Sequence, residues 1–183
     1  PRVREYLKSQ DIPRHVNRRL YLSDEDIHMA AGYLYVYGFD PTAFNFQHPP
    51  LIKYLYGYAI RFFGNPYIVQ LFFGSALLVL TYFAALRITK KTWVAFLSAL
   101  FLVTDPVFLD LSQHTLLDLG QAVFAMSYVL AHIYMPSAFV LQGVLLGLFA
   151  ASKFWSTTLF FIGAVGLYRY LKKTLNIRNF SFQ

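Results

Sequence analysis

Long apolar stretches dominate the chain from residue 67 onward, and they constrain its fold more than any other feature. Five such stretches lie near residues 67–87, 92–109, 115–135, 137–152 and 154–171. Most of them approach the roughly 20 residues that a helix needs to cross the hydrocarbon core of a bilayer. Because a helix satisfies its own backbone hydrogen bonds in lipid, we predict an all-α integral membrane protein built as a multi-span helical bundle.

The composition excludes an ordinary water-soluble domain. Of the 183 residues, 57% are hydrophobic and only 14% are charged, against roughly 25% charged in soluble globular domains. The chain has no cysteine, which excludes a disulfide framework, a thiolate metal site and a cysteine nucleophile. It begins at Pro1 without a short apolar leader, and we expect it to be part of a longer protein.

The charged residues sort to two sides of the predicted bundle. Basic residues end the first and the fifth stretches (Arg87, Lys90, Lys91, Arg169, Lys172, Lys173, Arg178), whereas the acids beyond residue 66 are Asp105, Asp110 and Asp118. With five spans, both basic ends face one side, which the positive-inside rule makes cytoplasmic. The acids then lie on the outer, non-cytoplasmic face. Because the basic residues flank apolar stretches, we expect membrane lipid rather than nucleic acid as the partner.

Residues 1–66 are predicted to form an outer-side segment, and residues 67–175 the transmembrane bundle. Residues 1–22 are polar and basic, which is typical of a solvated surface segment or of one that rests on lipid headgroups. Ser23 is placed to cap a helix that runs to about residue 37, with Asp26 three positions later as in a capping box. Gly38 ends this helix, and residues 39–50 form a proline-containing loop.

Residues 51–63 are predicted to form a helix too short to cross a bilayer. Lys53, Gly57 and Arg61 recur at every fourth position, so they form one polar stripe opposite an apolar face. This pattern indicates an amphipathic helix that lies in the membrane interface. In that setting Lys53 either extends to lipid headgroups or belongs to a site.

Two groups of residues suggest packing roles. An interfacial aromatic belt, or alternatively the wall of a lipid-tail groove, is predicted from Tyr54, Tyr56, Tyr58, Phe62, Phe63, Tyr67, Phe72 and Phe73. Close helix packing is predicted at Gly143, Gly147, Gly163 and Gly166.

Charged residues near a membrane are costly and therefore tend to be functional. The predicted topology gathers Asp24, Glu25, Asp26, Lys53, Asp105, Asp118 and Lys153 in one outer pocket. A carboxylate there can take a proton from a hydroxyl, and a lysine can neutralise a departing phosphate. Asp24 and His28 stand one helical turn apart, a spacing that suits two ligands of a divalent metal, although no third ligand is evident. These residue types fit group transfer from a lipid phosphate.

Four segments, taken in order, resemble the protein O-mannosyltransferase family of the GT-C membrane glycosyltransferases. They are SDEDIH at 23–28, HPPLIK at 48–53, DPVFLDLSQHTLLD at 105–118 and LQGVLLGLFAASKFW at 141–155. The resemblance spans residues 22–170. It implies transfer of a sugar from a dolichyl-type polyprenyl phosphate to a hydroxyl of a protein or lipid acceptor, with inversion at the anomeric carbon.

The resemblance also implies roles for residues. Asp24 matches the family's catalytic base, and Glu25 matches the second acid of the pair. The donor and its phosphate are expected at His48 and Lys53 of the HPP segment, at Asp118 and at Lys153. No cofactor is expected, although some GT-C relatives use a divalent ion at the corresponding acid.

The chain departs from the family at one predicted position. Gln70 stands where many relatives have an arginine at the start of a span. The family also has further spans, so the chain covers roughly the first half of its fold. The alternative to an enzyme is therefore a non-catalytic membrane subunit that works with a partner. A transporter or channel is disfavoured, because the centres of the predicted spans carry few polar groups.

Overall fold

The computed structural model describes residues 2–10 and 22–174, and these residues form nine helices and no strand. In chain order the helices are α1 (Val3–Gln10), α2 (Asp24–Val36), α3 (Leu51–Phe63), α4 (Tyr67–Thr89), α5 (Thr92–Thr104), α6 (Pro106–Gln113), α7 (Asp118–Tyr134), α8 (Phe139–Ser152) and α9 (Trp155–Thr174). The predicted all-α class is confirmed for these residues. Residues 11–21 of the predicted basic segment 1–22, together with Arg178, lie outside the described residues.

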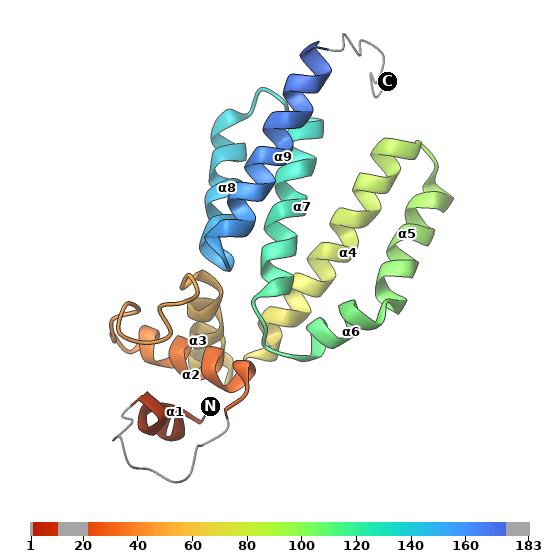
Figure 1. The fold of residues 1–183 in the computed structure, drawn as a ribbon. Helices are drawn as coiled ribbons and strands as arrows, with labels where there is room; N and C mark the ends of the chain where they lie inside the picture. The colour runs from red at the N-terminus through yellow and green to blue at the C-terminus, as the bar shows by residue number, and fades with distance from the viewer. Residues whose placement is uncertain (1, 11–21, 175–183) are drawn as a thin grey trace.

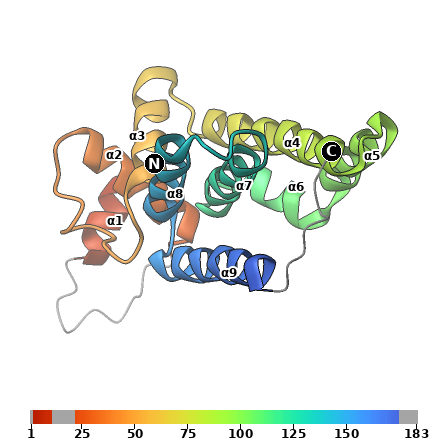
Figure 2. The ribbon, with the colours of Figure 1, turned by 90° about the horizontal axis from the view of Figure 1, so that it is seen from above.

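The longer helices run side by side, and the three N-terminal helices gather at one end of them (Figure 1). α4 packs against α5 and α7, and α8 packs against α7 and α9. In the second view α7 lies between α4 and α8 (Figure 2). The α4–α5 turn and the end of α9 both lie at the end opposite α1–α3. The two basic ends of the predicted bundle therefore share one end of the molecule.

α4 is the one described helix that is long and apolar enough by itself to cross a bilayer. It has 23 residues, and 18 consecutive residues within it have a mean hydropathy of 2.0. α7 has 17 residues and α8 has 14, and the apolar part of α9 is Ser156–Leu167. Five predicted spans are therefore not confirmed, and the multi-span arrangement stays a prediction.

The second predicted span, residues 92–109, is wrong as a continuous helix. α5 ends at Thr104 and α6 begins at Pro106, and the two helices are bent by 62° at this break. A proline has no N–H to continue the hydrogen-bond ladder of the preceding helix. The Asp105 side chain accepts a hydrogen bond from the Phe108 N–H at 2.9 Å, which caps α6. The local cap and the proline therefore outweigh the apolar run.

The predicted start of α2 is confirmed. The Ser23 hydroxyl oxygen accepts a hydrogen bond from the Asp26 N–H at 3.2 Å, and the hydroxyl donates to the Asp26 carboxylate at 3.1 Å. α2 ends at Val36, and Gly38 follows with a φ of +90°, a left-handed conformation that glycine adopts without strain. This cap fixes where α2 begins and therefore places Asp24, Glu25 and Asp26 in its first turn.

α2 and α3 cross at two glycines. A Cβ built on Gly32 would lie 2.0 Å from the carbonyl oxygen of Lys53, and one built on Gly57 would lie 2.1 Å from the carbonyl oxygen of Gly32. Only glycine allows two helix backbones to approach so closely. The predicted packing glycines are different ones, and that prediction is wrong. Nothing lies within 4 Å of a Cβ built on Gly143, Gly147, Gly163 or Gly166.

The main apolar core lies where α3, α4 and α7 meet. Tyr56 of α3 is fully buried and Phe73 of α4 is 2% exposed, so these two do not belong to the predicted interfacial belt. A second cluster joins α1 to α2. It includes Tyr6, which is 1% exposed, so this part of residues 1–22 is not the predicted solvated segment. The first cluster therefore packs α3 against the bundle, and the second packs α1 and α2 together beside Tyr54 of α3.

Candidate functional site

Lys153 and Asp118 meet at one end of the bundle as an ion pair. Asp118 is the first residue of α7, and Lys153 follows the last residue of α8. The Lys153 ammonium donates a hydrogen bond to the Asp118 carboxylate, with side chains that are 21% and 39% exposed. The backbone of Lys153 is not helical, with φ −145° and ψ −135°. The break between α8 and α9 therefore places this lysine beside the start of α7.

The His48 ring lies next to this ion pair. Its centroid is 4.5 Å from that of Phe154 and 5.7 Å from that of His28. Burial lowers the pKa of His48, Lys53 and Lys153 lower it further, and the carboxylates of Asp24 and Asp118 oppose the shift. His48 is therefore close to charged groups from four separate segments. Its Nδ1 is buried and has no hydrogen-bond partner among the described residues.

Asp24 and His28, both on α2, face the His48 ring and the Lys153–Asp118 ion pair. Asp24 is exposed in the first turn of the helix, and its carboxylate raises the pKa of both His28 and His48. Burial, with help from His48 and Lys53, lowers the pKa of His28 to about 4, so this ring is neutral at pH 7. The His28 Nδ1 lies 3.4 Å from the Thr115 carbonyl oxygen, to which it can donate a hydrogen bond.

Asp24 and His28 do not gain the third ligand that a divalent ion would require. Across the described residues, no three His, Asp or Glu side chains converge as a ligand set. Since His28 is buried and directs one ring nitrogen to a backbone carbonyl, it is poorly placed to share an ion with the exposed Asp24. Among the described residues, Asp24 and His28 alone therefore do not make up a metal site, and a bound divalent ion stays a prediction.

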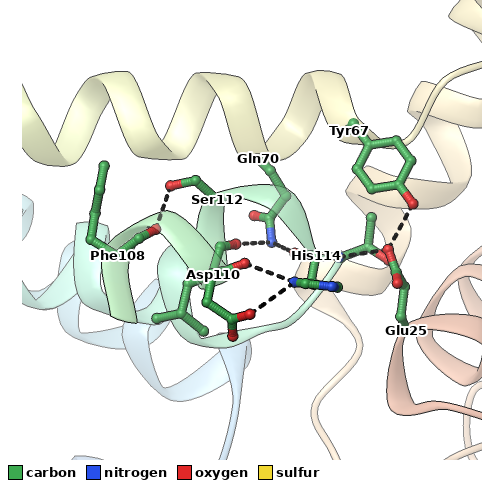
Figure 3. Close-up of polar contacts among 9 residues, drawn as sticks. Glu25, Tyr67, Gln70, Phe108, Asp110, Ser112 and His114 are labelled. Carbon is green, nitrogen blue, oxygen red and sulfur yellow. Dashed lines mark hydrogen bonds and ion pairs between the residues drawn. The ribbon is translucent and has the colours of Figure 1, made fainter. Parts of the chain in front are cut away.

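Glu25 fastens α2 to the bundle. Its Oε1 accepts hydrogen bonds from the Tyr67 hydroxyl at 2.8 Å and from the Thr115 N–H at 3.2 Å (Figure 3). Tyr67 begins α4, and Thr115 precedes α7. The two acids of the sequence pair therefore differ in their surroundings: Asp24 is open to solvent, whereas Glu25 ties three elements together.

Gln70, which stands where the sequence resemblance predicts an arginine, holds the α6–α7 connection. It is fully buried, and its Nε2 donates hydrogen bonds to the carbonyl oxygens of Leu111, at 3.0 Å, and of His114 (Figure 3). The Leu116 carbonyl oxygen also accepts from Gln70, at 3.2 Å. Its Oε1 has no partner among the described residues. Gln70 thus positions the connection that leads to Asp118.

Lys53 is fully buried. The alternative prediction, that it extends from a polar stripe to lipid headgroups, is therefore wrong. Its Nζ donates hydrogen bonds to the carbonyl oxygen of Asn45 at 2.7 Å, to Asn45 Oδ1 at 2.9 Å, to the His48 carbonyl oxygen at 2.7 Å and to the Tyr35 hydroxyl at 3.3 Å. Burial lowers the pKa of Lys53 to about 7. Lys53 therefore holds the 39–50 loop and, with it, the position of His48. A direct contact between Lys53 and a phosphate stays a prediction.

Four of the predicted site residues come together: Asp24, His48, Asp118 and Lys153. Glu25 and Lys53 lie beside the cluster and direct their charged groups to other partners. The predicted outer pocket also included Asp26 and Asp105. Asp26 instead donates its N–H to the capping Ser23 and pairs its carboxylate with Arg2, and Asp105 caps α6. Sequence reasoning missed the contact of Phe154 with His48. It assigned Tyr67 to an aromatic belt or a lipid-tail groove and missed its hydrogen bond to Glu25. The signal that could have identified Phe154 is its place directly after Ala-Ser-Lys in the fourth segment.

Comparison with known proteins gives no match to this chain from protein-family models, curated proteins or solved structures. The likeness to protein O-mannosyltransferases therefore rests on the four sequence segments alone and stays a prediction.

Proposed function

We propose that this protein is a multi-span membrane glycosyltransferase of GT-C type. It transfers a mannose-like sugar from a polyprenyl phosphate to a hydroxyl of a protein or lipid acceptor, with inversion. The observation that carries the proposal is the convergence of the four sequence segments. Asp24, His48, Asp118 and Lys153 come from four separate parts of the chain and gather at one end of the bundle.

The surface of the helices supports placement in a membrane. Val140 is 84% exposed, Phe160 is 82% exposed and Phe101 is 71% exposed, each on a different helix. Large apolar side chains in such numbers are costly in water and favourable against lipid tails. In this placement the broken α5–α6 pair and the short α8 are part of a membrane bundle. Their exposed apolar surface contacts lipid or further helices. The clustered site faces the non-cytoplasmic side.

Asp24 acts as the general base in this mechanism. Its carboxylate is exposed, so an acceptor hydroxyl can approach and give up its proton to it. The hydroxyl oxygen forms a bond to the anomeric carbon as the bond to the phosphate oxygen breaks. One such displacement inverts the anomeric centre, and the polyprenyl phosphate leaves with the bonding electron pair.

Lys153 neutralises the departing phosphate. An ammonium group has three N–H donors, and Asp118 takes one of those of Lys153. No other described residue accepts a hydrogen bond from Lys153, so the remaining donors are available for phosphate oxygens. His48 is neutral at pH 7 because its pKa is lowered, and it offers a hydrogen-bonding ring beside the same space. Glu25 positions the first turn of α2, and Lys53 positions the loop of His48.

Transfer from a set of radiolabelled polyprenyl-phosphate sugars tests the proposal, with the natural full-length protein in detergent. Asp24→Asn is expected to lower the rate by about 100-fold or more. Asp26→Asn is the matched control and should keep most of the activity. Asp26 lies on the same helical turn, but its carboxylate is engaged by the Ser23 hydroxyl and by Arg2. Lys153→Met should also lower turnover. Undiminished transfer by Asp24→Asn would exclude this residue as the base.

One observation favours a second candidate, a non-catalytic subunit with the same fold. Gln70 replaces a cation with a neutral amide whose Nε2 is taken up by three carbonyl oxygens. This subunit would show no transfer alone and would co-purify with a partner chain. Turnover by the purified protein without a partner excludes it.

A further inference from the structure

An open groove of about 640 Å³ lies between α3, α4 and α7, and the proposed chemistry does not use it. Its walls include Phe62 and Phe63 from α3, Phe72 and Val79 from α4, and Phe124 from α7. Phe62, Phe63 and Phe72 are 70%, 68% and 67% exposed. α4 packs against both other helices here (Figures 1 and 2). A contiguous apolar surface of this kind marks a binding site more often than ordinary surface.

The shape and chemistry of the groove suit a hydrocarbon chain. Its volume falls in the range of about 300–1,000 Å³ that is typical of small-molecule sites. Tyr58 and Ser127 supply the only side-chain polar groups of its lining, and no lining residue is charged. Ala59 and Ala76 also line it, and their short side chains leave room between the phenylalanines.

A cation stands at the edge of this groove. The Arg61 guanidinium lies 6.0 Å from the ring centroid of Phe62 and 5.5 Å from that of Tyr37. Arg61 is exposed, and no acid or other acceptor among the described residues engages its N–H donors. The two rings therefore hold a planar guanidinium with its donors free, and a guanidinium matches the oxygens of a phosphate in a fork-like geometry.

We propose that this groove binds one anionic glycerophospholipid, with an acyl chain between α3, α4 and α7 and its phosphate at Arg61. The proposal rests on the membrane placement of the proposed function and not on sugar transfer. The lipid would cover the exposed apolar surface beside α3 and hold this helix in the membrane interface. Its phosphate would lie near the C-terminal end of α3, away from the His48 loop at the N-terminal end.

The phosphate position at Arg61 is separate from the one proposed at Lys153. Lys53 lies near the start of α3, where it holds the His48 loop. Arg61 lies eight residues further along the same helix, which is about 12 Å at 1.5 Å per residue. Lys153 contacts Asp118 and Phe154 instead. A glycerophospholipid at Arg61 therefore leaves the clustered site free for a donor.

Native mass spectrometry of the full-length protein in detergent tests the inference. Dioleoyl-phosphatidylglycerol and dioleoyl-phosphatidylcholine have the same chains and differ in net charge, so they separate the role of Arg61 from that of the groove. The wild type is expected to bind phosphatidylglycerol about fivefold more tightly, as one arginine near a membrane surface would give. Arg61→Gln should lose this preference, whereas Arg4→Gln, a matched exposed arginine on α1, should keep it.

A second variant examines the groove itself. Val79 is 54% exposed, so Val79→Trp can narrow the groove without crowding the core, and it should weaken both lipids several-fold. Equal binding of the two lipids by the wild type overturns the proposal, as does a preference that survives in Arg61→Gln. Displacement of phosphatidylglycerol by equimolar polyprenyl phosphate also overturns it, because the groove would then belong to the donor. Each result is obtained without any transfer assay, so loss of the proposed enzymatic function leaves the outcome readable.

Discussion

Replacing Gly32 by alanine is expected to force α2 and α3 apart. The new Cβ would lie 2.0 Å from the Lys53 carbonyl oxygen and 2.9 Å from its carbonyl carbon. Favourable contacts between heavy atoms lie at about 3.5–4.0 Å, so the helices would have to separate by more than about 1 Å. Backbone atoms inside a helix cannot rotate out of the way as the end of a side chain can.

The expected loss of stability follows from this geometry. Overpacking that side chains can absorb costs typically about 1–3 kcal/mol, and a backbone clash places Gly32→Ala at about 3 kcal/mol or above. Gly143→Ala is the matched control, because it also lies inside a helix and nothing is within 4 Å of its Cβ. Alanine there should leave stability unchanged or raise it by about 0.5–1 kcal/mol. The two equal chemical changes are therefore expected to have opposite effects.

Thermal unfolding in one detergent, followed by circular dichroism, measures both variants. For a chain of this size, 1 kcal/mol corresponds to roughly 2–4 °C in Tm. Gly32→Ala should therefore melt at least about 6 °C below the wild type, while Gly143→Ala should melt with it or slightly above. If Gly32→Ala melts with the wild type, α2 and α3 do not cross so closely, and the placement of Asp24 on α2 beside the cluster is refuted.

Three further predictions concern polar groups around the site. Lys53→Met should lower the free energy of unfolding by about 2 kcal/mol or more, because buried carbonyl oxygens of the loop lose their donor; an unchanged midpoint in denaturant would contradict this. The pKa of His28 is lowered to about 4 from 6.5, so between these values only the unfolded state takes up the proton. Stability should therefore fall as the pH drops through this window, and His28→Phe should flatten that part of the profile. Tyr67→Phe should cost about 1 kcal/mol by removing the hydrogen bond to Glu25. In a double-mutant cycle with Glu25→Gln the two costs should be less than additive, and additive costs would refute the contact.

The helical elements could be predicted from the sequence where a local signal and an apolar pattern agreed. The start of α2 at Ser23 and the bounds of α3 at 51–63 follow from a cap and from the flanking proline and glycine. The break at Asp105 was also marked by Pro106, yet the apolar run on both sides favoured one continuous span. The Asp105 cap and the missing N–H of Pro106 broke the helix there, although about eighteen consecutive residues are mostly apolar.

Glycine packing was the weakest prediction, and the reason is physical. Glycines four residues apart in α8 look like a packing motif, but in this chain they face open space. Gly32 and Gly57 lie in different helices, and no spacing along the chain relates them. Only the meeting of α2 and α3 makes both of them necessary.

The sequence by itself determined that this protein is helical, strongly apolar, and equipped with acids and lysines in four short segments. Those properties follow from composition, caps and periodicity, which act over a few residues. The tertiary structure decided which charged groups meet. Lys53 is buried against a loop, although its spacing with Arg61 resembles a surface stripe. Lys153 pairs with Asp118 across 35 residues of sequence. Burial and pairing depend on contacts between distant segments, and these arise only when the helices pack.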